Sequence, residues 1–264
     1  MPCIGFTAKS DFCSRAFGKQ NCNCPSRASK TLASNLTKFM KKLSMFTFAA
    51  MAVAASLVFA ADSGQPVPEK PDKNGWFKLF DGKTLSGWKT ADNPGSWRAE
   101  GDLIVGDGER SHLFSPNTYT NLEFKAEVKL NHSGNSGMYF RAAFGPGWPE
   151  GYEAQVENTS PDPNRTGSLY RFHSVKEQLV QDDTWWTQHV IAIGNRTIIK
   201  VNDKIATDFV DEKNTFKSGH VALQQHNAGS VVQFRNVMVK RLAENEKAAW
   251  AEAKKDMPDI ADKK

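Results

Sequence analysis

Residues 122–130 read LEFKAEVKL, and apolar and charged side chains alternate over all nine positions. In an extended chain successive side chains point to opposite faces, so one face of this segment is apolar and the other is charged. A helix would instead repeat its apolar residues every three or four positions. The segment therefore predicts a β-strand with one buried face.

Short segments of similar character follow along the chain, separated by clusters of Gly, Pro, Asn and Asp. Residues 201–204 (VNDK) predict a hairpin turn between two of them. Between residues 75 and 242 no sustained helical period occurs, and so many short strands indicate a sandwich or jelly roll. The further predicted strands are Leu103–Val105, Met138–Ala142, Tyr152–Glu157, Leu169–Phe172, Trp186–Ile193, Thr197–Val201, His220–Gln225 and Val231–Leu242.

The chain begins with segments that we expect to lie outside this domain. Met40 opens a basic stretch, residues 43–59 are mostly apolar, and small residues precede position 61, which together predict a signal peptide over residues 40–60. Residues 1–39 then form a mis-called N-terminal extension, with a long unusual leader as the alternative. We expect a linker over 61–74, a β-jelly-roll catalytic domain over 75–242, and a solvated helical or frayed tail over 243–264.

The predicted cleavage changes the composition of the chain. All four cysteines (Cys3, Cys13, Cys22 and Cys24) precede the cleavage site, so we expect neither a disulfide nor a lipid anchor afterwards. The chain has 34 basic and 29 acidic residues. Residues 1–60 hold eight of the basic residues and one of the acidic residues. The remaining 26 and 28 give a net charge of −2, which does not favour nucleic-acid binding. We therefore expect a periplasmic or secreted protein with no nucleic-acid partner and no membrane anchor after cleavage.

A row of polar side chains marks the candidate site. In GYEAQVEN (151–158), strand geometry turns Tyr152, Ala154 and Val156 inward and sets Glu153, Gln155 and Glu157 in a row on the other face. NSGMYFR (135–141) has the same alternation, with its Tyr and Arg on one face. In a curved sandwich such a face lines a groove that suits a sugar, whereas in a flat one it is an ordinary solvated surface.

Several of these segments carry a family resemblance. GWFKLFDGKTLSGW (75–88) resembles the opening motif of the 3-keto-disaccharide hydrolase family, which is common in secreted bacterial proteins. NSGMYFR, GYEAQVEN, TGSLY (166–170), GHVALQQH (219–226) and VQFRNV (232–237) resemble its later motifs in the same order. The resemblance implies a concanavalin A-like (lectin or glucanase) jelly-roll sandwich, a carbohydrate substrate, and an upstream sugar 3-dehydrogenase that makes the ketone.

The spacing of the carboxylates bears on the mechanism. An ordinary glycosidase needs two carboxyl groups ~5–9.5 Å apart, but Glu153 and Glu157 lie ~13 Å apart along a strand. The position between them is Gln155, where jelly-roll glucanases place a carboxylate. The resemblance implies another route: a ketone at C3 acidifies the C2 proton, a base removes it, the C1 group leaves, and water adds to the double bond. That route needs one base and one group that stabilises an enolate oxygen.

The candidate residues follow from these needs. Glu153 is the predicted base or metal ligand, Arg141 the enolate-stabilising cation, and His226 a base, acid or ligand on a strand whose polar face also carries His220 and Gln224. If a divalent metal binds, we expect Glu153 and His226 to hold it, although no tight ligand spacing indicates one. His112 and His173 are weaker candidates. The predicted substrate-binding residues are Gln155, Tyr139, Glu157, Gln224 and Trp148.

Three functions fit this pattern. The first is an enzyme that cleaves 3-keto-glycosides by elimination and hydration. The second is a non-catalytic lectin-like carbohydrate-binding module, and the third is a structural envelope domain with an inert groove. A fold alone does not choose among them. The arrangement of Glu153, His226 and Arg141 does, because only the enzyme needs an acid-base group close to a cation.

Overall fold

The computed structural model describes residues 70–258 and residue 260. The predicted extension, the signal peptide, most of the linker and the four cysteines lie outside these residues. Within residues 70–258, no helix has the length and the apolar composition that crossing a bilayer requires.

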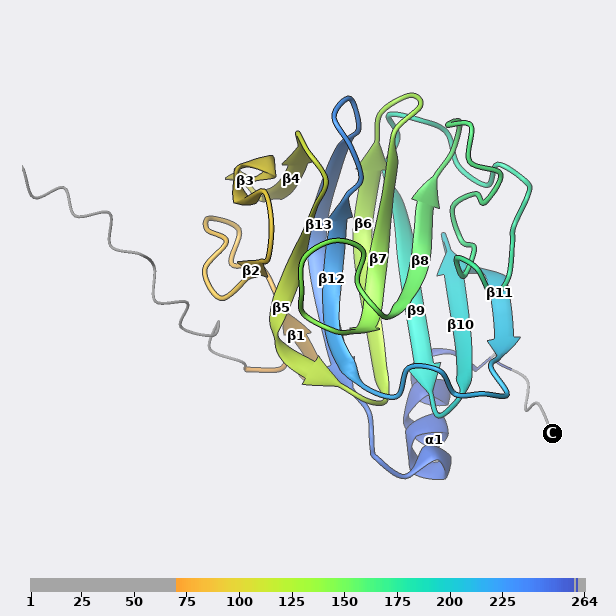
Figure 1. Ribbon diagram of the computed structural model, residues 1–264. Coiled ribbons are helices and arrows are strands. Elements are labelled where there is room, and N and C mark those ends of the chain that lie inside the picture. Colours follow the sequence, from red (N-terminus) through yellow and green to blue (C-terminus); the bar gives the residue numbers. More distant parts are fainter. Residues whose placement is uncertain (1–69, 259, 261–264) are drawn as a thin grey trace, which may run out of the picture. The chain divides into compact units, whose positions relative to one another are not determined.

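Two antiparallel sheets pack face to face, the smaller in front of the larger in the view of Figure 1. The predicted all-β jelly-roll sandwich is therefore confirmed. The larger sheet has the order β11-β10-β9-β6-β13-β4-β3, with β1 also paired to β13, and the smaller has the order β2-β5-β12-β7-β8. The larger sheet contains β1 (Trp76–Lys78), β3 (Trp97–Glu100), β4 (Leu103–Asp107), β6 (Leu122–Leu130), β9 (Trp186–Ile193), β10 (Arg196–Val201), β11 (Lys204–Val210) and β13 (Val231–Arg241), and the smaller contains β2 (Lys89–Thr90), β5 (Ser111–Tyr119), β7 (Asn135–Ala142), β8 (Tyr152–Glu157) and β12 (Gly219–Gln225).

Three strands have the predicted bounds, namely β6, β8 and β9. The hairpin between β10 and β11 is also confirmed, because Asn202 and Asp203 both have positive φ angles, 46° and 65°, as a two-residue type I′ turn requires. Residues 169–172 do not form the predicted strand. Leu169 makes isolated bridges to Ala154 and His173, so this segment is an irregular edge along β8.

The apolar faces of the two sheets form one core. Tyr152, Ala154 and Val156 of β8 lie in this core, as predicted, together with Met138 and Phe140 of β7. The alternate residues of these two strands therefore project from the opposite face of the smaller sheet. Every residue of β7 and β8 is nevertheless buried, so the polar face of these strands is covered rather than solvated.

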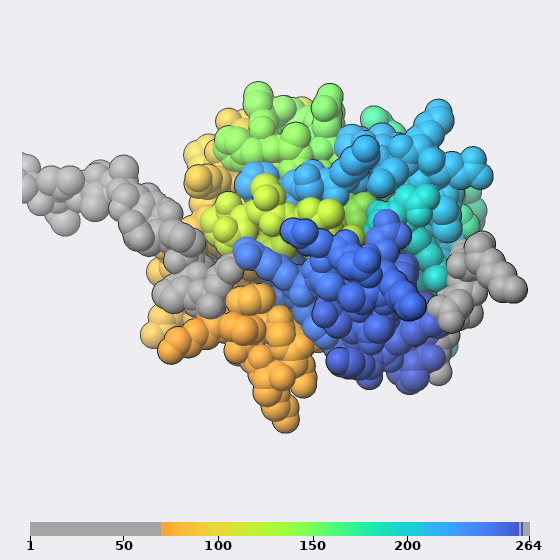
Figure 2. Space-filling view, turned by 90° about the horizontal axis from the view of Figure 1, so that it is seen from below, coloured from red at the N-terminus to blue at the C-terminus, as the bar shows by residue number. Residues whose placement is uncertain are grey.

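The C-terminal segment forms a helix, as predicted, but one face of this helix is buried rather than solvated. Helix α1 (Glu246–Asp256) starts at Asn245, whose side chain accepts a hydrogen bond from the Ala248 amide. Ala249 and Ala253 are fully buried in an apolar cluster with residues of β9 and β10, including Ile191. Small apolar residues four positions apart let the helix pack closely against the outer face of the larger sheet. Figure 2, a view of the molecule from below, shows this segment in dark blue on the surface.

Candidate functional site

The polar face of the smaller sheet is assembled by strand register. Tyr139 of β7 lies opposite Glu153 of β8, and Gly137 lies opposite Gln155. On the other side of β7, Ala222 of β12 pairs with Tyr139. Two residues along β12, Gln224 pairs with His112 of β5. Side chains from four neighbouring strands therefore share one face, which is the face that the connection between β7 and β8 crosses in Figure 1.

A cavity of about 490 Å³ opens on this face. Its volume falls within the range of small-molecule sites in proteins. Loop residues from the connections after β7, β8 and β11 complete its walls. Six of the eight predicted site residues line it, namely Glu153, His226, Gln155, Tyr139, Gln224 and Trp148. Their location is as predicted, and their chemical roles stay predictions.

Glu153 lies at the floor of the cavity and is buried. The Tyr139 hydroxyl donates to its Oε2 atom at 2.8 Å, and the Gln224 amide donates to its Oε1 atom at 3.0 Å. Burial raises the pKa of Glu153 to about 7, and these two hydrogen bonds oppose the rise because they stabilise the charged form. A carboxyl group with this pKa exchanges a proton readily near neutral pH, which is what a general base requires.

Tyr139 and Gln224 hold this carboxyl group in place. Burial and the charge of Glu153 raise the pKa of the Tyr139 hydroxyl far above its ordinary value, so the hydroxyl stays protonated and donates. Gln224 also donates to the Tyr139 oxygen at 3.2 Å. The three side chains therefore form a closed triangle of hydrogen bonds in a buried place, where such contacts are strongest.

Gly137 provides the space that Glu153 occupies. A Cβ atom at position 137 would lie 2.9 Å from both Cγ and Cδ of Glu153, and closer still to its Oε1 atom. Gly137 is not among the glycines with positive φ, so its backbone conformation does not require glycine. A glycine inside a strand often marks the close approach of another group. The carboxyl group of Glu153 therefore leans across β7, over the gap that Gly137 leaves.

His112 is a buried neighbour of this triangle that sequence reasoning ranked low. Its Nε2 atom lies 3.4 Å from the Gln224 amide nitrogen, and its ring meets Tyr139 edge-on with centroids 5.2 Å apart. Burial lowers its pKa to about 4, so the imidazole is neutral at neutral pH. Its strand, β5, was not predicted, and the pairing of β5 with β12 that brings His112 beside Gln224 is seen only in the structure.

The cavity wall on the far side of Glu153 from His112 comes from the segment that runs along the outer edge of β8. The Tyr170 amide donates to the Glu153 carbonyl at 2.9 Å, which fixes this segment beside β8. Arg171 follows with a left-handed φ of 67°, and its guanidinium lies 5.7 Å from the centre of the Tyr170 ring. Arg171 lines the cavity, and its charge lowers the pKa of Glu153. It is thus a cation on the cavity wall that sequence reasoning did not name as a site residue, in a segment that was predicted to be a strand.

Arg141 does not face the cavity, and its predicted place beside Tyr139 is wrong. Its Nε atom donates to the Thr120 carbonyl at 2.8 Å, and its Nη1 atom donates to the carbonyls of Gly194 and Phe216 at 2.7 and 3.2 Å. The cause is local, because a φ of 51° at Arg141 interrupts the alternation of β7. The side chain therefore leaves the face that alternation assigned to it.

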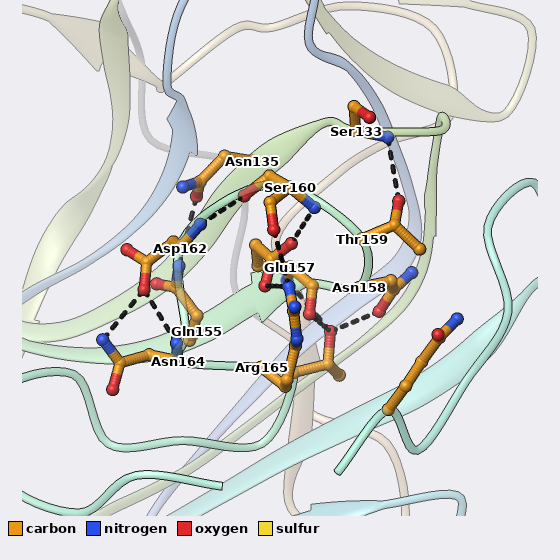
Figure 3. Close-up of polar contacts among 12 residues, drawn as sticks. Ser133, Asn135, Gln155, Glu157, Asn158, Thr159, Ser160, Asp162, Asn164 and Arg165 are labelled. Carbon is orange, nitrogen blue, oxygen red and sulfur yellow. Dashed lines mark hydrogen bonds and ion pairs between the residues drawn. The ribbon is translucent and has the colours of Figure 1, made fainter. Parts of the chain in front are cut away.

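Glu157 also lies outside the cavity lining, although it was predicted to bind substrate. Its Oε2 atom accepts from Arg165 at 2.6 Å, and its Oε1 atom accepts from the Ser160 amide (Figure 3). Burial raises its pKa, and the Arg165 guanidinium opposes that rise. Glu157 therefore braces the loop after β8. The same loop carries Asp162, which lines the cavity.

Gln155 and His226 occupy different depths of the site. Gln155 lines the cavity, is buried, and donates to the Asn135 side chain at 3.2 Å. His226 lies at the end of β12, partly exposed, with its Nδ1 atom 2.7 Å from the Asn227 side-chain oxygen. His220 of the same strand binds the Ser115 carbonyl instead. Among residues 70–258, no three His, Cys, Asp or Glu side chains are arranged to hold a metal ion.

Comparisons with known proteins agree with this fold. Two solved structures from Parabacteroides distasonis ATCC 8503, both provisionally named glycosyl hydrolases, superpose with TM-scores of 0.57 and 0.54 at 23% and 20% identity. The superpositions cover 64% and 63% of this chain, and 94% and 99% of those chains. At these identities the likeness shows the fold alone.

One curated relative is a protein of Bacteroides thetaiotaomicron VPI-5482 named 3-keto-disaccharide hydrolase. It is 30% identical over 83 residues, which are 27% of this chain and 29% of the relative. The matched segment thus spans less than a third of the relative's length. A family model described as the 3-keto-alpha-glucoside-1,2-lyase-like domain matches residues 75–240. Since that match covers more than half of the sequence, the chain belongs to this family.

Proposed function

We propose that the domain cleaves 3-keto-glycosides by elimination followed by hydration, with Glu153 as the base. The observation that carries the proposal is the buried carboxyl group at the cavity floor, which has a pKa of about 7 and is held by Tyr139 and Gln224. Membership in the family and the name of the curated relative support this substrate class.

The proposed reaction begins with proton transfer. Glu153 removes the proton from C2 of the sugar, and the electrons of that bond form an enolate whose negative charge rests on the oxygen at C3. The enolate then re-forms the ketone and expels the C1 substituent with its bonding electrons, which leaves a double bond between C1 and C2. Water adds a hydroxyl group to C1 and a proton to C2, so the net result is hydrolysis of the glycosidic bond.

Arg171 takes the role that the sequence assigned to Arg141. A cation close to the oxygen at C3 stabilises the enolate as it forms, and preorganised stabilisation of this kind is often the largest catalytic contribution. Arg171 lines the same cavity as Glu153 and is close enough to lower its pKa. Arg171 is exposed, which fits a residue that contacts the substrate rather than the protein interior.

Histidine 226 is the proposed proton donor to the leaving group. It lines the cavity near the end of β12, on the side away from Arg171, where an imidazole N–H can donate a proton to the departing oxygen. The substrate must first be oxidised at C3, so a sugar 3-dehydrogenase is the proposed upstream enzyme. The domain acts after export, and the mature protein recovered outside the cytoplasm should begin close to Ala61.

The test uses the purified protein with one disaccharide in its 3-keto and unoxidised forms, each with and without a chelator. Product from the 3-keto form alone supports the proposal, and loss of that product with chelator assigns a metal to the reaction. Glu153→Gln should abolish turnover while the circular dichroism spectrum stays unchanged. Wild-type turnover by that variant would remove Glu153 from the mechanism.

A lectin-like role is the second candidate, favoured by the amide groups of Gln155, Gln224 and Asn135 at the cavity wall. Amides and aromatic rings suffice to bind a sugar without any proton transfer. Calorimetric binding of the unoxidised disaccharide, with no cleavage of either form, would favour this role over the enzyme.

A further inference from the structure

We propose that Trp148 is a specificity-determining residue on which the leaving group stacks, and that it makes the protein prefer a sugar ring at C1 over a small substituent. The inference rests on the proposed function, because it takes the base and the cation from it. The C1 substituent is the part of the substrate that the base and the cation do not contact.

Trp148 is both part of the cavity wall and half exposed, with 51% of its surface accessible. Its ring lies 5.1 Å from the His226 ring and 5.8 Å from the His112 ring, measured between centroids. The Arg110 guanidinium carbon lies 5.2 Å from its centre. These contacts support the indole while half of it stays open, as a stacking surface requires.

The loop that carries Trp148 is fixed at several points. The Asp92 carboxylate accepts from the Gly147 amide at 3.0 Å and from Arg110 at 3.2 Å. At the base of the loop, the Ala143 amide donates to the Glu150 carbonyl at 2.8 Å. A side chain held in this way loses little conformational freedom when a ligand binds, so its contact with a ring contributes to affinity.

The order of the groups across the sheet gives the substrate a direction. Trp148 lies over β5 and the end of β12, because its ring neighbours are His112 and His226. The carboxyl group of Glu153 lies over Gly137, on the next strand β7. Arg171 lies on the far side, beyond the edge strand β8. The base is therefore between the cation and the indole.

Carbons C1, C2 and C3 of the sugar follow one another in the same order. When the oxygen at C3 is at Arg171 and the C2 proton is at Glu153, the C1 substituent points away from Arg171. It then leaves the polar floor on the side of Trp148. A pyranose ring presents one face of C–H groups, and an open indole is suited to cover such an apolar face.

The test compares two substrates that share the 3-keto-glucosyl group, one with a second glucosyl ring at C1 and one with a methyl group. Trp148→Ala should lower kcat/KM for the 3-keto-disaccharide by about 10- to 100-fold, from the lost contact area and ring contact. For the methyl glycoside the loss should be at least tenfold smaller. Trp148→Phe should restore much of the preference.

Phe144→Ala is the matched control, because Phe144 is the other half-exposed aromatic residue of the same loop and does not line the cavity. It should leave the ratio of the two kcat/KM values unchanged. Equal losses on both substrates in Trp148→Ala would overturn the inference and leave the proposed function standing. Failure of the wild-type protein to cleave either substrate would overturn the proposed function, and this inference with it.

Discussion

Replacing Glu153 with Gln should remove activity and, at alkaline pH, make the protein more stable. The pKa of Glu153 is about 7 in the folded protein and 4.5 for an ordinary glutamate. A group whose pKa is raised on folding contributes stability below its unfolded pKa, and that stability is lost as the pH rises through the folded pKa. For Glu153 this loss falls between about pH 4.5 and pH 7.

The size of the effect follows from the same two values. Each unit of pKa difference corresponds to ~1.4 kcal/mol, so the whole shift corresponds to ~3 kcal/mol, of which ~2–3 kcal/mol is lost between pH 5 and pH 8. Gln is uncharged at both pH values and still accepts the hydrogen bond from Tyr139. Its amide group faces the Gln224 donor, which costs roughly 1 kcal/mol at either pH.

Urea denaturation of both proteins at pH 5 and pH 8 measures this difference. The free energy of unfolding of Glu153→Gln, relative to wild type, should increase by ~2–3 kcal/mol between the two pH values. Taking the difference between proteins cancels the titration of all other groups that the substitution leaves unchanged. An equal offset at both pH values would refute the reasoning, since it would mean that Glu153 has an ordinary pKa in the folded state.

Three further changes test other parts of the site. Gly137→Ala should lower kcat/KM by about 100-fold, because its methyl group displaces the Glu153 carboxyl group, whereas Gly95→Ala, with open space around it, should leave kcat/KM unchanged. Arg171→Ala should lower kcat by roughly 100- to 1,000-fold. It should also move the acidic limb of the pH–rate profile to higher pH, because the cation lowers the pKa of Glu153. An acidic limb at the wild-type pH would place Arg171 outside the reaction. Arg141→Lys should destabilise the fold by ~2–4 kcal/mol, because hydrogen bonds to backbone carbonyls are lost. The kcat per folded molecule, measured after active-site titration, should stay the same. A lower kcat with unchanged stability would instead make Arg141 a catalytic residue.

Strand alternation predicted most of the cavity floor. Glu153 and Gln155 occupy the predicted face of β8, and Tyr139 lies opposite Glu153 on β7. These positions depend only on the two-residue period and on the pairing of neighbouring segments, both of which the sequence carries. The burial of this face was not predictable in the same way, because it results from loops that cross it.

The errors have physical causes that a periodic pattern does not contain. A positive φ at Arg141 redirects its side chain at the end of β7, and β-strand alternation assumes that no such residue occurs. Arg171 is in an irregular segment, and backbone contacts of Leu169 and Tyr170 with β8 bring it beside the site. The strand that carries His112, β5, was not predicted. It contains Pro116, and residues Ser111 to Ser115 are all buried, so no alternation of buried and exposed positions marks it.

Arg141 has a consequence for how the sandwich holds together. Its guanidinium joins three chain reversals: Thr120 between β5 and β6, Gly194 between β9 and β10, and Phe216 between β11 and β12. Two of these reversals carry the chain from one sheet to the other. Disulfide bonds tie such ends in many small proteins, but residues 70–258 contain no cysteine. The tie here is indifferent to redox conditions, so the melting temperature should be the same with and without a thiol reductant.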